Sequence, residues 1–307
     1  MAIGYVFIFI ALACGVTKGY CGKRTSGKVD YSSDALLINT LRMVLCIVIG
    51  FFMVAFGGMI SQLALDPTVF AICALSGVAT ASFVVSWLIS VRTESYMMID
   101  VCLLIGVIIP MLLCQFLYDE PITLWQWIGF GLLMIAGYVM CTYNSGLKGK
   151  MKLGNLLLMA LCAASNGFAD FSQKMFVKQN SGVDIAVFNF YTYVFAALAL
   201  LICFPIFRSK DRKTAEQSEV KLKAPLAIIK PIALYVVIMA ICLFLNSYFK
   251  TAAAQYLSAT QIYPINQGGT LMCAMLMAHF LFKERINLKA VCGIVLCLGA
   301  LLLINLT

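Results

Sequence analysis

Long runs of apolar residues without a charge recur along this chain from one end to the other. Each run is about 20 residues long, which is enough for a helix to cross the hydrocarbon core of a bilayer. Apolar residues make up 63% of the 307 positions and charged residues 11%, whereas a soluble domain is about half apolar and about a quarter charged. A water-facing surface cannot be built from so few charges, so we predict an all-α integral membrane protein with little soluble mass.

Ten such segments are predicted, which makes the chain a multi-pass protein of the cell (plasma) membrane in contact with lipid. Their approximate limits are 3–22, 34–56, 68–91, 95–118, 123–143, 153–177, 184–207, 226–249, 255–282 and 287–306. The first segment lacks the basic region and cleavage site of a secretory signal, so we expect it to be retained. The longest connection, from Arg208 to Lys223, is highly charged and is expected to be a flexible surface loop.

Residues 1–150 and 151–307 are predicted to be two copies of one five-helix unit. The matched pairs include Gly4 with Gly154, Asn39 with Asn189, and Glu120 with Glu284. Their separation grows from 150 to 164 positions because the second copy contains the longer charged connection. Five is an odd number of crossings, so the second copy must enter the membrane from the opposite face. Inverted repeats of this kind are typical of transporters, which bind substrate near the middle of the membrane between the two copies.

Lysine and arginine are distributed unevenly between the two sets of connections. The connections that follow the odd-numbered segments carry sixteen of these residues, and the other connections carry three, Lys174, Lys178 and Lys250. Because positively charged connections stay in the cytoplasm, we predict that both termini lie on the non-cytoplasmic side.

The sequence lacks the residues that several other classes of protein need. The basic residues behind the net charge of +9 lie in short connections instead of forming a surface patch, so no nucleic-acid partner is expected. The 13 cysteines lie almost all within apolar runs and include no Cys-x-x-Cys pair, and the chain has one histidine. No metal site or disulfide framework is therefore predicted. The chain also lacks the Gly-x-x-x-x-Gly-Lys motif of a nucleotide-binding loop, so an ATPase is not expected.

The loop between the fourth and fifth segments is similar to the loop between the ninth and tenth. In both places an apolar helix ends in Leu-x-x-Glu, at Glu120 and at Glu284, and a short turn and a glycine-rich last helix follow. With the stretch 251–259 and Pro264, this pattern resembles the drug/metabolite transporter (DMT) superfamily, and specifically its EamA-type ten-helix members. The resemblance covers both halves, with one departure: Asp100 occupies the first-half position that matches Pro264.

This resemblance implies secondary transport of a small metabolite, often an amino acid or a related compound, with no cofactor and no ATP hydrolysis. The motifs that support this resemblance are specific for the fold but indicate little about the substrate.

Three ionisable residues lie inside apolar segments of the first half: Lys18, Arg42 and Asp100. Such a residue costs about 2.5–3.5 kcal/mol at the middle of a membrane helix and usually faces a cavity or a partner. The alternating direction of the segments brings all three toward the same face. We predict that Lys18 and Arg42 attract an anionic group of the substrate and that Asp100 balances them or binds a coupling proton. The alternatives are snorkelling of Lys18 to the interface and a structural ion pair between the other two.

Polar residues inside the segments of the second half lie toward the other face and complete the predicted binding site. They are Asn166, Asp170, Asn189, Tyr193, Asn246, Tyr263, Asn266 and Gln267, with Tyr96 from the first half. Pro264, Gly268 and Gly269 lie beside two of them and could unwind the ninth segment locally, which would free carbonyl groups for a ligand. The alternative is that these side chains bond neighbouring helices.

Other recognisable residues are interpreted as structural. Glu120 and Glu284 lie at helix ends, and Thr123 forms a predicted capping box with Gln126. His279 is expected to pack or to bond a loop. Glycines of the last helix in each half are expected to permit close helix packing. These two helices could instead pair protomers, so a monomer and a homodimer both stay open.

We predict a secondary active or facilitative transporter that moves a small polar metabolite, such as an amino acid or an organic anion, by alternating access. A proton gradient or the solute's own gradient would drive it. The alternatives are an exporter of cationic or amphipathic drugs and a membrane receptor or assembly protein without transport. A membrane-embedded enzyme would need clustered acids or histidines near an interface. A channel usually needs several identical subunits or a charged ring around a pore.

Overall fold

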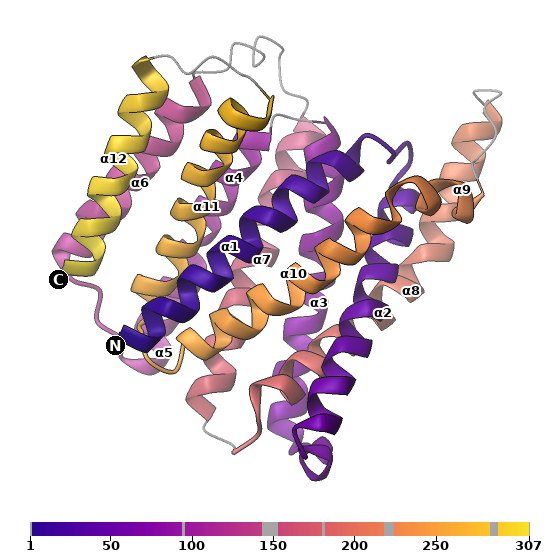
Figure 1. Cartoon of the computed structure of the whole chain (residues 1–307), viewed down its shortest axis with the longest axis horizontal. Coiled ribbons are helices and arrows are strands. Elements are labelled where there is room, and N and C mark those ends of the chain that lie inside the picture. Colours follow the sequence, from indigo (N-terminus) through magenta and orange to yellow (C-terminus); the bar gives the residue numbers. More distant parts are fainter. Residues whose placement is uncertain are drawn as a thin grey trace.

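The computed structural model describes residues 2–93, 96–142, 153–179, 182–217, 224–282 and 288–306, and within them it contains helices and no strands. Figure 1 shows the helices side by side in a bundle, with both termini at the same end. The first half forms α1 (Ala2–Ser26), α2 (Ser32–Phe56), η1 (Ile60–Leu63), α3 (Pro67–Thr93), α4 (Tyr96–Gly106), α5 (Ile108–Tyr118) and α6 (Leu124–Thr142). The second half forms α7 (Leu153–Gln179), α8 (Ile185–Gln217), α9 (Pro225–Ile229), η3 (Lys230–Ile232), α10 (Ala233–Ala253), α11 (Ala259–Phe282) and α12 (Leu288–Leu306).

Six stretches of helix in the described part of the chain are long and apolar enough to cross a membrane. They lie in α1, α2, α3, the pair α4 and α5, α8, and the continuation of α9 into α10, while α6 and α12 contain shorter apolar stretches. The helices α7 and α11 belong to neither group, because polar side chains interrupt their apolar sequence. The prediction of an all-α membrane protein is therefore confirmed, whereas the count of ten crossings stays a prediction.

The fourth predicted segment is wrong as a single helix, because the structure divides it at Val107 into α4 and α5. Pro110 lacks the N–H group that would bond the carbonyl of Gly106 one turn earlier. The break packs directly against α7: a side chain at Gly106 would meet the backbone of Ala163, and Gly167 lies against the carbonyl oxygen of Gly106. The two glycines therefore let α7 approach the broken segment closely.

The predicted unwinding of the ninth segment is also wrong. The helix α11 is continuous from Ala259 to Phe282, with Pro264 inside it. Its two glycines serve close packing: a side chain at Gly268 would crowd Leu133 of α6, and one at Gly269 would crowd Leu12 of α1. Neighbouring helices thus use the room that a ligand was expected to use.

The helix α8 extends into the connection that was expected to be a flexible loop. Its charged end is anchored on the start of α2, where Asp211 accepts a backbone N–H at 2.7 Å and Arg208 lies 3.7 Å from Asp34. The expectation is therefore wrong as far as Gln217, because these charges find partners on another helix. The rest of that connection, 218–223, lies outside the described residues.

Local capping determines the turn between α5 and α6. The helix α5 ends at Asp119, whose left-handed backbone (φ 51°) closes the helix. The Thr123 N–H donates to Gln126 Oε1 at 3.1 Å, and the Gln126 N–H donates to Thr123 Oγ1 at 3.3 Å. The predicted capping box is thus confirmed, and it leaves Glu120 at the middle of a tight, well-defined turn.

Four helices form the centre of the bundle in two long pairs, α1 against α10 and α3 against α7. The helix α2 packs against α8, and α6 packs against α12 at one edge of the molecule (Figure 1). The prediction that glycines bring the last helices together is confirmed at Gly129, where a side chain would meet Ile304. It is wrong at Gly131 and Gly299, which have no neighbouring atoms within 4 Å among the described residues.

Candidate functional site

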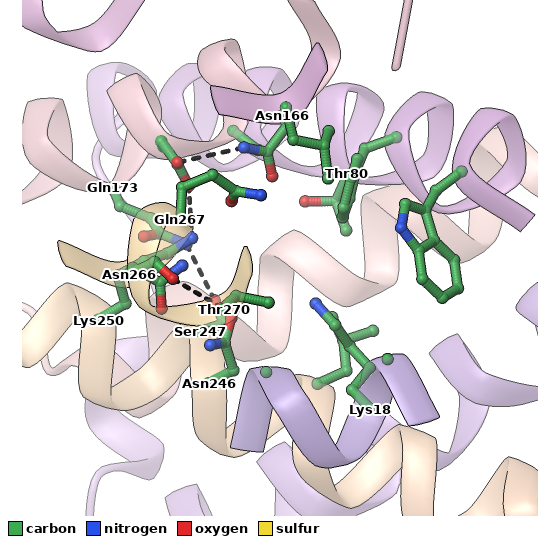
Figure 2. A pocket seen from close by; sticks show the side chains of 18 of the residues that line it. Lys18, Thr80, Asn166, Gln173, Asn246, Ser247, Lys250, Asn266, Gln267 and Thr270 are labelled. Carbon is green, nitrogen blue, oxygen red and sulfur yellow. Dashed lines mark hydrogen bonds and ion pairs between the residues drawn. The ribbon is translucent and has the colours of Figure 1, made fainter. Parts of the chain in front are cut away.

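A polar cavity of about 70 Å³ lies in the middle of the bundle, where α1, α3, α4, α7, α8, α10 and α11 meet. Both halves of the chain contribute to it. Its polar and charged lining residues are Lys18, Thr80, Asp100, Asn166, Asp170, Gln173, Tyr193, Asn246, Ser247, Lys250, Asn266, Gln267 and Thr270. Figure 2 shows these side chains converging from several helices on one open centre. So many polar groups inside a membrane bundle mark a candidate functional site, because each is costly where lipid is the surrounding solvent.

Lys18 reaches the cavity from the middle of α1, which continues two further turns to Ser26 and is longer than predicted. Its side chain points toward the open centre (Figure 2). The ammonium lies 5.6 Å from the centre of the Phe83 ring. None of the ion pairs found among the described residues includes it. Lys18 is therefore a positive charge that is available to a ligand.

Three oxygen atoms on the cavity wall are buried and have no hydrogen-bond partner among the described residues. They are Asp100 Oδ2, Gln173 Oε1 and Asn266 Oδ1. Buried polar atoms in folded proteins are almost always paired, and an unpaired one costs about 1–3 kcal/mol. The three oxygens come from α4, α7 and α11, so one ligand with several N–H or O–H donors could satisfy them together. This group of unpaired acceptors opposite Lys18 is the main chemical feature of the site.

Asp170 and Lys250 form a buried ion pair between α7 and α10. The Asn166 amide donates to the other carboxylate oxygen of Asp170 at 3.4 Å. Tyr263 donates its hydroxyl hydrogen to the backbone carbonyl of Asp170 at 2.5 Å. The carboxylate is thus held in place by its neighbours, and its charge is balanced within the protein.

One chain of hydrogen bonds leads from the cavity wall into the bundle. The Gln173 amide donates to Ser247 Oγ at 3.2 Å, and Ser247 donates to Asn189 Oδ1 at 2.6 Å. Asn189 in turn donates to the carbonyl of Ile185 at 3.0 Å. We call Gln173, Ser247 and Asn189 the polar bridge, because they join α7, α10 and α8 across one side of the cavity.

The structure gathers most of the predicted site residues around this cavity. The residues that line it are Lys18, Asp100, Asn166, Asp170, Tyr193, Asn246, Asn266 and Gln267. The two predicted groups, which were expected toward opposite faces, are thus brought together in one place. The side chain of Tyr96 lies outside the described residues, as does that of His279.

Three other predicted residues lie one layer behind the cavity wall. Asn189 and Tyr263 contact wall residues through the hydrogen bonds given above. Arg42 is 1% exposed and donates to Asn39 Oδ1 at 2.5 Å. Its Nε atom has no partner among the described residues. Neither direct substrate contact nor an ion pair with Asp100 is therefore seen for Arg42 in this conformation.

Sequence analysis missed Thr80, Gln173, Ser247, Lys250 and Thr270. Lys250 was assigned to a connection, whereas it is a buried residue of α10. A helical signal was present: Asn166, Asp170 and Gln173 are spaced to share one face of α7. The corresponding face of α10 carries Asn246 and Lys250, four residues apart. Searching for polar stripes at this spacing, instead of for single charges, would have found Gln173 and Lys250.

Comparison with known proteins agrees with this geometry. Residues 153–306, half of the chain, match the model of the EamA-like transporter family. The chain belongs to the EamA-like transporter family. This confirms the resemblance to the drug/metabolite transporter superfamily, and it makes the chain a multi-pass membrane protein of a family of transporters rather than enzymes.

A protein of known crystal structure has the same fold as this EamA-like chain. The two superpose with a TM-score of 0.74 over 100% of this chain and 97% of the other, at 14% sequence identity. No curated protein matches the sequence. At this identity the structural likeness establishes the fold over both halves and leaves the substrate to be argued from the site.

Away from the cavity, this EamA-like protein has a second ionic cluster, which we call the Glu120 clamp. Glu120 Oε1 lies 3.0 Å from Lys174 Nζ and 3.0 Å from Lys178 Nζ, and Oε2 accepts the Ala259 N–H at 2.9 Å. Lys174 Nζ also donates to the carbonyl oxygens of Ala254 and Leu257, at 3.1 and 2.7 Å. The clamp thus joins the α5–α6 turn of the first half to α7, α10 and α11 of the second. These contacts are consistent with the predicted structural role of Glu120, which stays a prediction, and Glu284 lies outside the described residues.

Burial acts to raise the pKa of the Glu120 carboxyl, but the Ala259 N–H and the two lysines outweigh burial and leave the pKa below its ordinary value. The Glu120 carboxylate is therefore ionised at neutral pH.

A larger cavity of about 420 Å³, the outer vestibule, lies at the same end of the bundle as the clamp. Aromatic and polar residues line it, among them Phe7, Gln62, Phe176, Asp184 and Tyr248. On α7 and α10 these residues follow the cavity residues Gln173 and Ser247 within one helical turn. The polar bridge therefore lies between the central cavity and the outer vestibule.

Proposed function

We propose that this chain is a carrier that moves a small polar metabolite across the cell membrane by alternating access. The observation that carries the proposal is the central cavity, where the unpaired Lys18 faces three unpaired acceptors. Such a site suits a solute with an anionic or strongly accepting group for Lys18 and several N–H or O–H donors for Asp100, Gln173 and Asn266. Amino acids and related organic acids have this combination.

The size of the central cavity supports a carrier in a closed conformation. A volume of about 70 Å³ holds only a few water molecules, each of which needs roughly 10–15 Å³ of such space. A metabolite larger than this small group of waters enters only if the surrounding helices move apart. A site that must open to load and then closes again is the central requirement of alternating access.

The packing supports two inverted repeats, residues 1–150 and 151–307. If each of the ten predicted segments is exchanged for its counterpart in the other half, the pair α1 with α10 becomes the pair α7 with α3. These are the two long pairs at the centre of the bundle. The pairs α2 with α8 and α6 with α12 map onto themselves under the same exchange. A family match over 153–306 is consistent with a second unit of this length.

The two contacts that close the vestibule end are proposed to be the gate on that side. The polar bridge separates the central cavity from the outer vestibule, and the Glu120 clamp ties the first half to the second at the same end. Opening toward the vestibule would require both to separate. By the distribution of positive charge, that end and both termini face away from the cytoplasm.

The alternatives make different demands on the cavity. An exporter of cationic or amphipathic drugs would need a large, mostly apolar pocket, whereas this site is polar and carries an unpaired lysine. A receptor without transport would not need a vestibule next to a closed site. The proton is a candidate coupling ion because Asp100 lines the cavity with an unpaired oxygen.

The test is uptake by the purified full chain in proteoliposomes. Radiolabelled amino acids, organic acids and cationic drugs are compared, each with and without a proton gradient. We expect saturable, counterflow-capable flux of a solute that has both an acceptor group and N–H donors. Flux of cationic drugs alone would favour the exporter. If no member of a broad panel moves although the folded protein binds one of them, a carrier function is excluded in favour of a receptor.

A further inference from the structure

An apolar groove of about 270 Å³ lies on the outside of the bundle, away from the central cavity. It is formed by α2, α3, α7 and α8, and all but two of its 13 lining residues are apolar. Leu36, Ala81 and Leu200 form a buried floor, while Val78 and Leu161 are about half exposed at its edge. The hydroxyl of Ser86 is satisfied by the carbonyl of Ser82 at 2.6 Å, so the groove offers little to a polar ligand.

The groove lies toward one surface of the membrane. It takes residues from the beginning of α2 and α7 and from the later parts of α3 and α8. These are the helix ends that connect to the most basic segments of the chain, at the end of the bundle opposite both termini (Figure 1). An occupant that enters from the membrane would therefore have its polar part at the level of the lipid headgroups.

Lysine residues continue the wall of the groove toward the membrane surface. On α8, Cys203 and Phe207 line the groove, and Lys210 follows at the spacing that keeps it on the same helix face. Lys213 lies one turn further on. Both lysines are exposed, and neither belongs to an ion pair found among the described residues.

The acidic residues nearby are already engaged. Asp34 accepts the N–H groups of Asp30 and Tyr31 at 3.1 and 3.0 Å, and its other oxygen faces Arg208. Asp211 is buried and accepts a backbone N–H of α2. Glu216 pairs with Arg212 at 3.0 Å. Asp30, just before α2, is exposed, but on the described part of α8 the exposed charges that have no acidic partner are the positive ones of Lys210 and Lys213.

We propose that this groove is a binding site for an anionic phospholipid, with one acyl chain in the groove and the phosphate group at Lys210 and Lys213. The apolar lining and the unpaired lysines at the mouth match the two parts of such a lipid. A flexible acyl chain fits such a groove, and the bilayer supplies it. This site is separate from the transport cavity and does not depend on the proposed cargo.

The experiment compares phosphatidylglycerol with phosphatidylcholine of the same acyl chains, added to the purified full chain in detergent. Retained lipid is measured by native mass spectrometry, and the thermal unfolding midpoint is followed as lipid is added. Labelling of Cys203 by a lipid-soluble maleimide, quantified on its own peptide, reports occupancy of the groove. We expect phosphatidylglycerol to bind more tightly, to raise the midpoint more and to protect Cys203.

Two sets of variants separate the contribution of the acyl chain from that of the phosphate headgroup. Ala199→Phe fills the groove and should abolish binding of both lipids, whereas the control Leu198→Phe, on the exposed side of α8, should not. The double variant Lys210→Gln and Lys213→Gln should weaken phosphatidylglycerol binding by roughly 25-fold, since each lysine near an anionic lipid contributes about 5-fold. The control Lys230→Gln, an exposed lysine outside the groove, should change nothing.

Three outcomes would overturn the proposal. Equal binding of the two lipids by the wild-type chain would exclude recognition of an anionic headgroup. Unchanged binding in Ala199→Phe would place the lipid elsewhere. A dimer that dissociates in Ala199→Phe would show that a second copy of the chain occupies the groove. If Ala199→Phe does not fold, the lysine variants, which alter only exposed side chains, still decide whether the headgroup is bound there.

Discussion

Lys18 and Asp100 are the two charged residues of the central cavity that are not part of an ion pair found in the described chain. The other two, Asp170 and Lys250, neutralise each other. A charge without a partner inside a membrane bundle is costly and is a candidate for function by default, and these two line the cavity, which Arg42 does not. At the scale of single residues, the function therefore concentrates on this unpaired lysine, this unpaired carboxyl and the amide oxygens beside it.

Replacing Lys18 by Gln should raise the KM for an anionic solute by about 10- to 100-fold, the equivalent of losing a charged hydrogen bond of about 1.5–3 kcal/mol. Lys18→Arg keeps the positive charge and should raise the KM less. The control Lys28→Gln, in which an exposed loop lysine is removed, should transport normally. The measurement is concentration-dependent uptake in proteoliposomes. An unchanged KM in Lys18→Gln would show that Lys18 does not hold the cargo.

Replacing Arg42 by Met should leave the protein as stable or make it more stable, by about 1–2 kcal/mol. Arg42 is a buried charge with no carboxylate partner among the described residues, and its Nε atom is unpaired. An apolar side chain of similar length removes that desolvation cost. The thermal unfolding midpoint in detergent measures the effect. A marked fall of the midpoint would show that Arg42 stabilises this conformation, and a raised KM would restore its predicted role in binding.

At the scale of elements, the decisive feature is how helix ends meet at the vestibule side. Lys174 satisfies carbonyl oxygens at the end of α10, and Glu120 satisfies an N–H at the start of α11. The positive charge of Lys174 lies at a helix C-terminus and the negative charge of Glu120 at a helix N-terminus, so each complements the partial charge of that helix end. The two groups also pair with each other. The turn of the first half thus caps α11 through Glu120, and the same carboxylate holds Lys174 of α7, which caps the end of α10.

Replacing Glu120 by Gln should lower the stability by about 3 kcal/mol, because it leaves the buried ammonium of Lys174 without its counter-charge. Lys178→Gln is the matched control, since Lys178 contacts the same carboxylate but is 36% exposed and should cost less than about 1 kcal/mol. Thermal unfolding of both variants at neutral pH checks this. Equal effects of the two substitutions would refute the idea that the buried pair of Glu120 with Lys174 contributes most of the stability.

The same clamp predicts a dependence of stability on pH. The pKa of Glu120 is lower in the folded protein than its ordinary value of 4.5, so the folded state binds the proton less well than the unfolded state does. Its stabilising contribution is therefore complete at neutral pH and is lost as the pH falls from about 4.5 through the folded pKa. The unfolding midpoint of the wild-type protein, measured between pH 3 and 7, should fall at the acid end. The midpoint of Glu120→Gln should fall less over that range. Parallel curves for the two proteins would contradict the assignment.

At the scale of the whole molecule, the two long pairs α1 with α10 and α3 with α7 surround the cavity and join one half to the other. A relative movement of the halves would change the cavity from both sides at once. If the proposed gate opens at the vestibule end, the polar bridge and the Glu120 clamp can exchange their bonds for water contacts at a modest cost, but apolar contacts such as Phe7 with Phe249 must separate there as well. A dry apolar seam at that position would have to expose apolar surface instead.

The proposed topology predicts where three tags will be found. Epitope tags at the N-terminus and at the C-terminus should both be labelled in intact cells, whereas a tag inserted within 218–223 should be labelled only after the membrane is made permeable. The reason for this expectation is that positively charged connections stay in the cytoplasm. A known cytoplasmic protein serves as the control for cell integrity. Termini on opposite sides would refute an even number of crossings, and two cytoplasmic termini would refute the orientation.

The sequence by itself determined that this chain crosses a membrane as helices, because apolar length is a property of each segment alone and lipid leaves the backbone no other partner. It also determined local features such as the capping box at Thr123, whose partners are three residues apart. Only the tertiary structure decided that Asn266, Asp100 and Lys18 face one cavity while Arg42 does not. Those facts depend on how far each helix is rotated and shifted against its neighbours. The close contacts of Gly106 and Gly268 set that placement, and the partner atoms lie far away in the sequence.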